Sequence, residues 1–268
     1  MRSIGELLSL KGRVAFVTGG AGHMGLAIGE TLLELGALVI ISDLKERDCK
    51  KRTEFLNQKG FTGKAIPLPA DLSSEKKTRQ AILKCKEIAG QLDILIHAAA
   101  FVGTDTYPGW VCPLEKQTIS AWDRALRINM TSAFTLVQAA LPLLHQALHP
   151  SVIFISSIYG IVGPDFDIYE GTTMTTPAGY AASKAGLAQL GRYLACALAP
   201  KVRVNTVIAG GIFRHQPTPF CEAYIKRTPL KRMATEEDFK GVIAYLASDL
   251  SLYVTGSEIK VDGGWTAW

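Results

Sequence analysis

Short apolar runs alternate along this chain with stretches in which apolar residues recur at helical spacing. The runs that read as buried strands are residues 14–17, 38–41, 65–68, 92–97, 151–156, 202–208 and 258–261. The helical patterns fall at residues 26–35, 45–59, 73–89, 119–148, 180–199 and 239–246. Pro142 lies within the fourth of these and predicts a kink or break there. Such alternation predicts one α/β domain spanning residues 1–268, with a doubly wound parallel sheet.

Three stretches do not fit the alternation: residues 101–120, 160–179 and 210–235. Each follows the carboxyl end of a predicted strand, which is the edge of an open α/β sheet where ligands bind. Long loops at that edge are usually functional. We therefore expect residues 160–179 and 210–235 to form a substrate site.

Composition narrows the class of protein. The net charge of +5 is spread along the chain, without the clustering and aromatic interleaving of a nucleic-acid site, and it suits a small anionic ligand equally well. We find no apolar run near the ~20 residues of a membrane helix and no signal-like N-terminal core, so we expect a cytoplasmic location. The five scattered cysteines suggest neither a disulfide framework nor a metal site.

A glycine-rich segment joins the first predicted strand to the first predicted helix. Within residues 18–25, Gly20, Gly22 and Gly25 fit the spacing G-x-G-x-x-G. Such glycines let the turn close, let a pyrophosphate approach the backbone and let helix and strand pack. The pattern predicts a dinucleotide site, and the alternative is a tight turn without a ligand.

Acidic residues follow the next two strands. Asp43 ends the second strand, where its carboxylate would accept hydrogen bonds from the adenosine ribose and repel a 2′-phosphate. This favours NAD over NADP, although Lys45 and Arg47 lie close by as solvated helix charges or phosphate partners. Asp71 and Leu72 follow the third strand; they would meet the adenine ring, or Asp71 would cap the next helix.

Candidate acid–base chemistry appears on the fifth helical pattern. Tyr180 and Lys184 lie one helical turn apart, so their side chains share a face. A nearby ammonium lowers the pKa of a tyrosine hydroxyl, which otherwise titrates near 10. Ser157 follows the fifth strand and could bond a substrate oxygen, with Ser156 as its competitor. Asn129, a polar amide in an apolar helix, binds a backbone carbonyl or holds a water chain.

Taken in order, the turn at residues 18–25, Asp43, Asp71, Asn129, Ser157, Tyr180, Lys184 and the ending at residues 261–264 resemble the short-chain dehydrogenase/reductase family over essentially the full length. The resemblance implies a Rossmann-like fold with a seven-stranded parallel sheet. It also implies Tyr180 as the acid–base, Ser157 polarising the substrate, Lys184 holding the ribose, and Asn129 supporting a proton relay. Homodimers or homotetramers are usual. The expected cofactor-binding residues are Gly19, Gly22, His23, Met24, Gly25, Asp43, Asp71, Leu72, Ala98, Lys184, Gly210 and Ile212.

The chain departs from the family pattern in four places, one of which is Ala209-Gly210-Gly211 where Pro-Gly is usual after the sixth strand. Gly22 gives a glycine spacing that resembles the longer branch acting on nucleotide sugars, whose extra C-terminal region is missing here. His97 begins the segment His-Ala-Ala-Ala, where the family usually has Asn-Asn-Ala-Gly. We therefore expect the fourth strand to lack the side-chain support that is usual in the family. Ser157 and Tyr180 are also about ten residues further apart than is common. That insert and the C-terminus are similar to the subgroup of bacterial surface-glycan and flagellin-modification oxidoreductases.

The loops suggest a sugar substrate. Hydroxyl-binding groups crowd the insert at Asp165, Asp167, Tyr169, Glu170, Thr172 and Thr173, and Tyr107 and Trp110 could stack on a pyranose. Cations that could pair with a phosphate are Arg214, His215, Lys226, Arg227, Lys231 and Arg232. We expect a secondary alcohol on a phosphorylated or nucleotide-linked sugar. The alternatives are ordinary surface charges and packing aromatics, a nucleotide-sugar epimerase or dehydratase with retained NAD, a dehydrogenase of a non-sugar alcohol, and a non-catalytic dinucleotide sensor.

Overall fold

The seven apolar runs pair side by side into one parallel sheet. The computed structural model describes residues 1–103 and 105–268. The strands are β1 (Val14–Thr18), β2 (Leu38–Ser42), β3 (Lys64–Pro67), β4 (Ile94–His97), β5 (Ser151–Ser157), β6 (Arg203–Ala209) and β7 (Glu258–Val261). Their spatial order is β3-β2-β1-β4-β5-β6-β7. The order reverses between β1 and β4, which places a ligand crevice outside the carboxyl ends of these strands. The predicted doubly wound sheet is confirmed.

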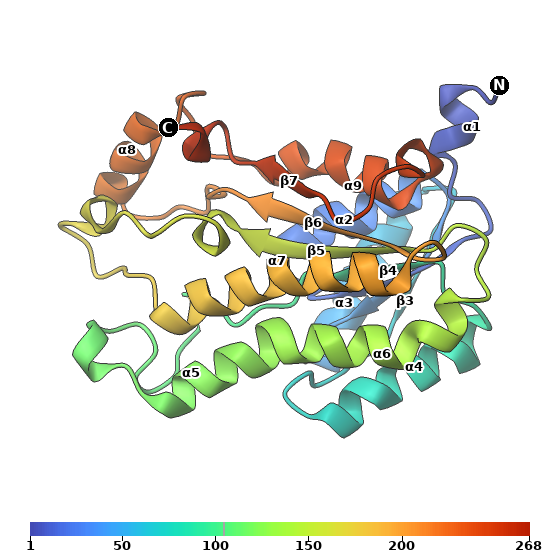
Figure 1. Cartoon of the computed structure of the whole chain (residues 1–268), viewed down its shortest axis with the longest axis horizontal. Helices are drawn as coiled ribbons and strands as arrows, with labels where there is room; N and C mark the ends of the chain where they lie inside the picture. Colours follow the sequence, from blue (N-terminus) through green and yellow to red (C-terminus); the bar gives the residue numbers. More distant parts are fainter. Residues whose placement is uncertain (104) are drawn as a thin grey trace.

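Helices cover both faces of this sheet (Figure 1). They are α1 (Ile4–Leu8), α2 (His23–Glu34), α3 (Glu46–Gln58), α4 (Glu75–Ala89), α5 (Ile119–Leu126), α6 (Ser132–Leu144), α7 (Ala178–Leu198), α8 (Thr218–Arg227) and α9 (Lys240–Ala247). One buried cluster joins the sheet to α4, α6 and α7, and a second joins it to α2, α3 and α9. No helix among the described residues is long and apolar enough to cross a membrane.

The helices differ from the sequence pattern in two places. The stretch 210–235, which we expected to be irregular, contains α8, with Pro219 in its first turn, where proline is compatible with a helix. Residues 119–148, which we expected to hold a long helix with a kink or break at Pro142, contain α5 and α6; α6 passes through the proline and ends two residues later, at Leu144. The irregular backbone lies upstream, in a π-helical turn at Arg127–Thr131 that separates α5 from α6.

The irregular stretches gather at the carboxyl edge of the sheet. The insert, with a 3₁₀ turn at Phe166–Tyr169, packs against α8 near the C-terminus, at one end of the molecule in Figure 1. Ile168, Phe220 and Trp265 form a buried cluster between these segments. Thr104, within the predicted stretch 101–120, lies outside the described residues. These loops therefore cover the carboxyl ends of the strands.

Candidate active site

The glycine-rich turn after β1 is shaped so that side chains do not fit. Gly19 has φ +66°, in the left-handed region that favours glycine. A Cβ on Gly25 would lie 2.2 Å from the carbonyl oxygen of Gly19. Gly22 is the N-cap of α2, and its lack of a side chain leaves the first N–H groups of the helix open to a ligand. This is the backbone cradle that a dinucleotide diphosphate requires.

A cavity of about 480 Å³ opens beside this turn. It is lined by nine of the predicted cofactor residues: Gly19, Gly22, His23, Met24, Gly25, Asp43, Asp71, Leu72 and Ala98. Gly210 lines a neighbouring cavity of about 440 Å³ instead, and Ile212 forms a single β-bridge with Ala234. The residues brought together here fit a dinucleotide, since backbone N–H groups and the carboxylates of Asp43 and Asp71 line one cavity.

The carboxylate of Asp43 lies at the end of β2 and faces the turn. Its Oδ2 accepts a hydrogen bond from the Ala21 N–H at 3.1 Å, and its Oδ1 accepts one from Leu44 at 2.7 Å. Each oxygen keeps a lone pair for a ribose hydroxyl. Lys45 is the exposed N-cap of α3 and Arg47 pairs with Asp48, so both cations are placed as solvated helix charges.

Asp71 lines the dinucleotide cavity but does not cap α4, because the N-cap of that helix is Ser74. Its Oδ1 accepts hydrogen bonds from the Ser73 N–H at 3.0 Å and the Ser73 hydroxyl at 2.6 Å, while Oδ2 pairs with Lys77 at 3.2 Å. The Ser73 hydroxyl and the other donors lower the pKa of Asp71. The carboxylate therefore organises the turn before α4 while lining the cavity.

Tyr180 and Lys184 project from one face of α7 toward the end of β5. The Lys184 Nζ lies 5.8 Å from the centre of the Tyr180 ring and donates a 2.8 Å hydrogen bond to the Ile155 carbonyl. Burial lowers the pKa of Lys184 to about 8. Burial also raises the pKa of Tyr180, while the Ser157 hydroxyl acts to lower it. Without further positive charge, Tyr180 is a neutral phenol near neutral pH.

The two candidate serines at the end of β5 make different contacts with α7. Ser156 is buried and its hydroxyl donates a 2.8 Å hydrogen bond to the Lys184 carbonyl, so it fastens β5 to α7. Ser157 accepts a 3.2 Å hydrogen bond from the Tyr159 N–H, and its hydroxyl interacts with Tyr180. Both hydroxyls therefore contact residues of α7, but only that of Ser157 interacts with Tyr180.

Asn129 is fully buried in the π-helical turn and its side chain clamps the loop after β4. Its Oδ1 accepts a 2.6 Å hydrogen bond from the Phe101 N–H, and its Nδ2 donates to the Phe101 carbonyl at 3.2 Å and to the Ser183 hydroxyl at 2.9 Å. Ser183 in turn donates to the Tyr180 carbonyl at 2.8 Å. A polar amide therefore connects the cofactor-side loop to the helix that carries Tyr180.

Comparison with known proteins agrees with this geometry. A family model described as enoyl-(acyl carrier protein) reductase, one of the short-chain dehydrogenase models, matches residues 19–266. The chain belongs to the short-chain dehydrogenase/reductase family. It is accordingly an oxidoreductase that acts on CH–OH groups and takes a nicotinamide dinucleotide and a small-molecule substrate.

Two curated members of the family are similar over almost the whole chain. The post-translational flagellin modification protein A of Campylobacter coli is 30% identical, with 96% of this chain and 99% of that protein covered. The rhamnolipids biosynthesis 3-oxoacyl-[acyl-carrier-protein] reductase of Pseudomonas aeruginosa is 35% identical, covering 96% and 97%. A solved Pseudomonas aeruginosa RhlG/NADP active-site complex superimposes with a TM-score of 0.82 at 30% identity, covering 97% of this chain and 98% of that one.

His97 stands at the position where the family usually has asparagine. We expected this difference to weaken the side-chain support of β4, but the imidazole provides that support. The residue is a register partner of Thr18 and is 1% exposed. Its Nδ1 lies 2.9 Å from the Thr18 Oγ1 and its Nε2 lies 3.3 Å from the Asn129 carbonyl oxygen. Since a carbonyl only accepts, Nε2 donates and Nδ1 accepts from the threonine hydroxyl. Burial and the nearby Lys184 ammonium lower the pKa of His97 to about 3, so the ring is neutral.

The insert of this dehydrogenase brings two phenols close to Tyr180. The hydroxyls of Tyr159 and Tyr169 lie 2.7 Å apart and share a hydrogen bond. Burial raises the pKa of both, and the charge of a Tyr180 phenolate would raise each further. The expected stacking of Trp110 on a substrate is wrong: the indole is 2% exposed, packs on Phe101 at 4.5 Å and donates to the Val102 carbonyl at 2.7 Å.

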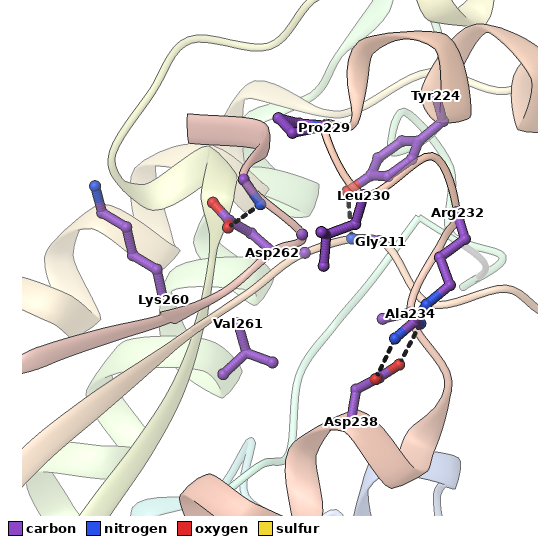
Figure 2. Close-up of a pocket in the computed structure, with 13 residues that line it drawn as sticks. Gly211, Tyr224, Pro229, Leu230, Arg232, Ala234, Asp238, Lys260, Val261 and Asp262 are labelled. Carbon is purple, nitrogen blue, oxygen red and sulfur yellow. Dashed lines mark hydrogen bonds and ion pairs between the residues drawn. The ribbon is translucent and has the colours of Figure 1, made fainter. Parts of the chain in front are cut away.

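Three arginines of the stretch 210–235 form ion pairs with acidic side chains. Figure 2 shows Arg232 in two hydrogen bonds with Asp238, 2.7 and 2.6 Å long, beside the neighbouring cavity at the ends of β6 and β7. Arg227 pairs with Asp165 at 2.5 Å. Arg214 pairs with Glu236 at 3.3 Å and lines the dinucleotide cavity. From the sequence we grouped these arginines as possible partners of a substrate phosphate, but in the folded chain each pairs with a different acidic residue.

Proposed function

We propose that the chain is an NAD-dependent dehydrogenase/reductase that interconverts a secondary alcohol and a ketone, with Tyr180 as the acid–base. The observation that carries the proposal is the convergence of Ser157, Tyr180 and Lys184 at the end of β5. Tyr180 packs against the buried cluster of Phe101, which lines the dinucleotide cavity. The dinucleotide, when bound, accepts or donates the hydride. The protein's own task is to move one proton at the substrate oxygen and to hold that oxygen in place.

Each residue has a defined part in that proton transfer. In the oxidation direction, the Tyr180 phenolate takes the proton of the substrate hydroxyl; in reduction, the phenol returns it to the carbonyl oxygen. The Ser157 hydroxyl donates a hydrogen bond to the same oxygen. The Lys184 ammonium, held by the Ile155 carbonyl, stabilises the phenolate and holds the cofactor ribose. Asn129 positions α7 through its hydrogen bond to Ser183. In this proposal it also supports a proton relay that serves Tyr180.

Asp43 supports the choice of NAD. Its carboxylate faces the cavity at the end of β2, where a 2′-phosphate would meet a like charge. The neighbouring cations Lys45 and Arg47 are placed on α3 as exposed charges, and do not line this cavity within the described residues. We therefore assign NAD rather than NADP as the working cofactor.

For the substrate we propose a sugar in surface-glycan biosynthesis, phosphorylated or nucleotide-linked, bound by the loops at residues 160–179 and 210–235. The phenols of Tyr159 and Tyr169 next to Tyr180 support a polyhydroxylated ligand, as does the 30% identity to a flagellin modification protein. Reduction of a 3-oxoacyl thioester is the second candidate, because the relative that carries that name is 35% identical.

We further propose a cytoplasmic enzyme that assembles as a homodimer or homotetramer. Exposed aromatic side chains on three successive helices support association: Trp122 on α5, Phe134 on α6 and Tyr193 on α7. Light scattering coupled to size exclusion should give the mass of two or four chains of 29.0 kDa. A 29.0 kDa species at micromolar concentration would contradict this part of the proposal.

A substrate panel tests the proposal. Sugar phosphates, nucleotide sugars, a 3-oxoacyl thioester and simple secondary alcohols are each incubated with NAD or NADP in both directions, and NAD(P)H absorbance is followed. The proposal predicts turnover of a sugar with NAD, with NADH accumulating beyond the amount of enzyme. Turnover of the thioester alone would select the second candidate. Isomerised or dehydrated sugar without accumulating NADH would identify the retained-NAD chemistry instead.

A further inference from the structure

The side chains of three residues from different parts of the chain meet beside the glycine-rich turn. His23 begins α2, Arg214 lies in the loop after β6, and Glu236 begins the 3₁₀ turn Glu236–Phe239. The Glu236 Oε1 lies 3.6 Å from the His23 Nδ1 and 3.3 Å from the Arg214 Nε. One carboxylate oxygen thus lies between Arg214 and the side chain of the first residue of α2.

The guanidinium of Arg214 borders the dinucleotide cavity and, among the described residues, keeps donors free for a ligand. Two guanidinium groups line that cavity within the described residues, those of Arg124 and Arg214. Arg124 lies over the rings of Phe101 and Tyr107, at 5.5 and 5.2 Å, on the side of the loop after β4. Arg214 lies on the side of the turn. Glu236 engages its Nε, and the remaining four N–H groups of an arginine fork are unaffected by that contact.

A diphosphate is the ligand group that this arrangement fits. It carries two negative charges, whereas a helix amino end offers the equivalent of only about half a positive charge. Gly22, as the N-cap, contributes backbone but no cation. An arginine fork matches two phosphate oxygens in geometry and stays charged at all working pH values.

We infer that Arg214 binds the diphosphate of the dinucleotide cofactor, closing the loop 210–235 over the glycine-rich turn, with Glu236 fixing the guanidinium for that contact. This inference rests on the proposed dinucleotide-dependent function. It moves Arg214 from the substrate-phosphate group, where the sequence pattern placed it, to the cofactor site.

The test measures ligand affinity rather than turnover. ADP-ribose, which has the diphosphate but lacks nicotinamide, and adenosine, which lacks phosphate, are titrated by calorimetry into the wild type, Arg214→Gln and Arg214→Lys; NADH is titrated by fluorescence. Charge-assisted hydrogen bonds contribute about 1.5–3 kcal/mol, so Arg214→Gln should weaken ADP-ribose and NADH about 10- to 100-fold. The affinity of Arg214→Lys for ADP-ribose and NADH should fall between those of the wild type and Arg214→Gln. All three proteins should bind adenosine with the same affinity.

The control variant is Arg232→Gln, which removes an arginine of the same loop that Asp238 holds beside the neighbouring cavity. It should bind ADP-ribose as the wild type does. Circular dichroism and thermal unfolding of each variant without ligand confirm that it is folded. If Arg214→Gln is unfolded, Arg214→Lys is compared with the wild type instead. Equal ADP-ribose affinity in wild type, Arg214→Gln and Arg214→Lys overturns the inference. A wild type that binds neither NADH nor ADP-ribose overturns the proposed function instead.

Discussion

Replacing His97 with asparagine would remove a titrating group from the core while preserving its hydrogen-bonding roles. The imidazole is 1% exposed and bridges the Thr18 hydroxyl to the Asn129 carbonyl. An asparagine offers the same pair of functions, one acceptor oxygen and one donor N–H₂. The two side chains differ in that imidazole can take up a proton near pH 6.5 in the unfolded chain.

The pH dependence follows from the depressed pKa. In the folded protein the pKa of His97 is about 3, against an ordinary value of 6.5. The unfolded chain therefore binds more protons between these values, and stability is fully present above pH 6.5 and is lost as the pH falls toward 3. For these two pKa values the free energy of unfolding drops by about 2 kcal/mol between pH 8 and pH 5 through this residue alone.

Urea unfolding of the wild type, His97→Asn and His145→Asn at pH 8 and pH 5 measures the effect. His145 is exposed at the end of α6, so its substitution is the matched control. We expect His97→Asn to lose about 2 kcal/mol less than either other protein on acidification. If all three lose the same free energy of unfolding, the buried neutral histidine is not the source and the reasoning is refuted.

Three further substitutions test other parts of the structure. Asp43→Ala should weaken NAD binding roughly 10- to 100-fold, since bonds to charged groups contribute about 1.5–3 kcal/mol, and should leave NADP binding unchanged or tighter; a constant NAD/NADP affinity ratio in fluorescence titrations would contradict the assignment. Gly25→Ala would place a Cβ 2.2 Å from the Gly19 carbonyl oxygen, so thermal unfolding should show a loss of about 1–3 kcal/mol or more; wild-type stability with intact NADH binding would contradict the close packing. At Asp249, burial acts to raise the pKa but hydrogen bonds led by that of Arg13 lower it to about 2. Asp249→Asn should therefore cost about 2 kcal/mol at pH 7, a difference that fades as the pH falls from 3.8 toward 2; a pH-independent cost in urea titrations would contradict this origin.

The sequence predicted the frame of the site because strand and turn signals are local. The apolar runs, the glycine turn and Asp43 lie within one βαβ unit, and the observed β1, α2 and β2 agree with the pattern to within a few residues. The helix α8 escaped notice because prolines and polar residues around 217–219 resemble a loop, although proline in a first turn is favourable to a helix.

The sequence alone could not predict which way a side chain faces or which distant residues it contacts. Whether Ser156 or Ser157 meets Tyr180 depends on how the end of β5 lies against α7, which the sequence alone does not show. The support that His97 gives is visible only once β1 and β4 pair in register, which makes Thr18 its neighbour. Trp110 carried a plausible stacking signal, but aromatic residues in a loop fill buried space as readily as they bind ligands.

The central claim is that Tyr180 transfers the proton beside a bound dinucleotide, and the Tyr180→Phe variant tests it most directly. The substitution removes one hydroxyl and keeps the ring that Lys184 faces at 5.8 Å. On the substrate that the panel identifies, we predict a fall in kcat of about 10²- to 10⁴-fold, the usual contribution of a positioned acid–base group, with NADH binding within about twofold of wild type. Wild-type turnover by Tyr180→Phe, with NADH bound as before, would contradict the account.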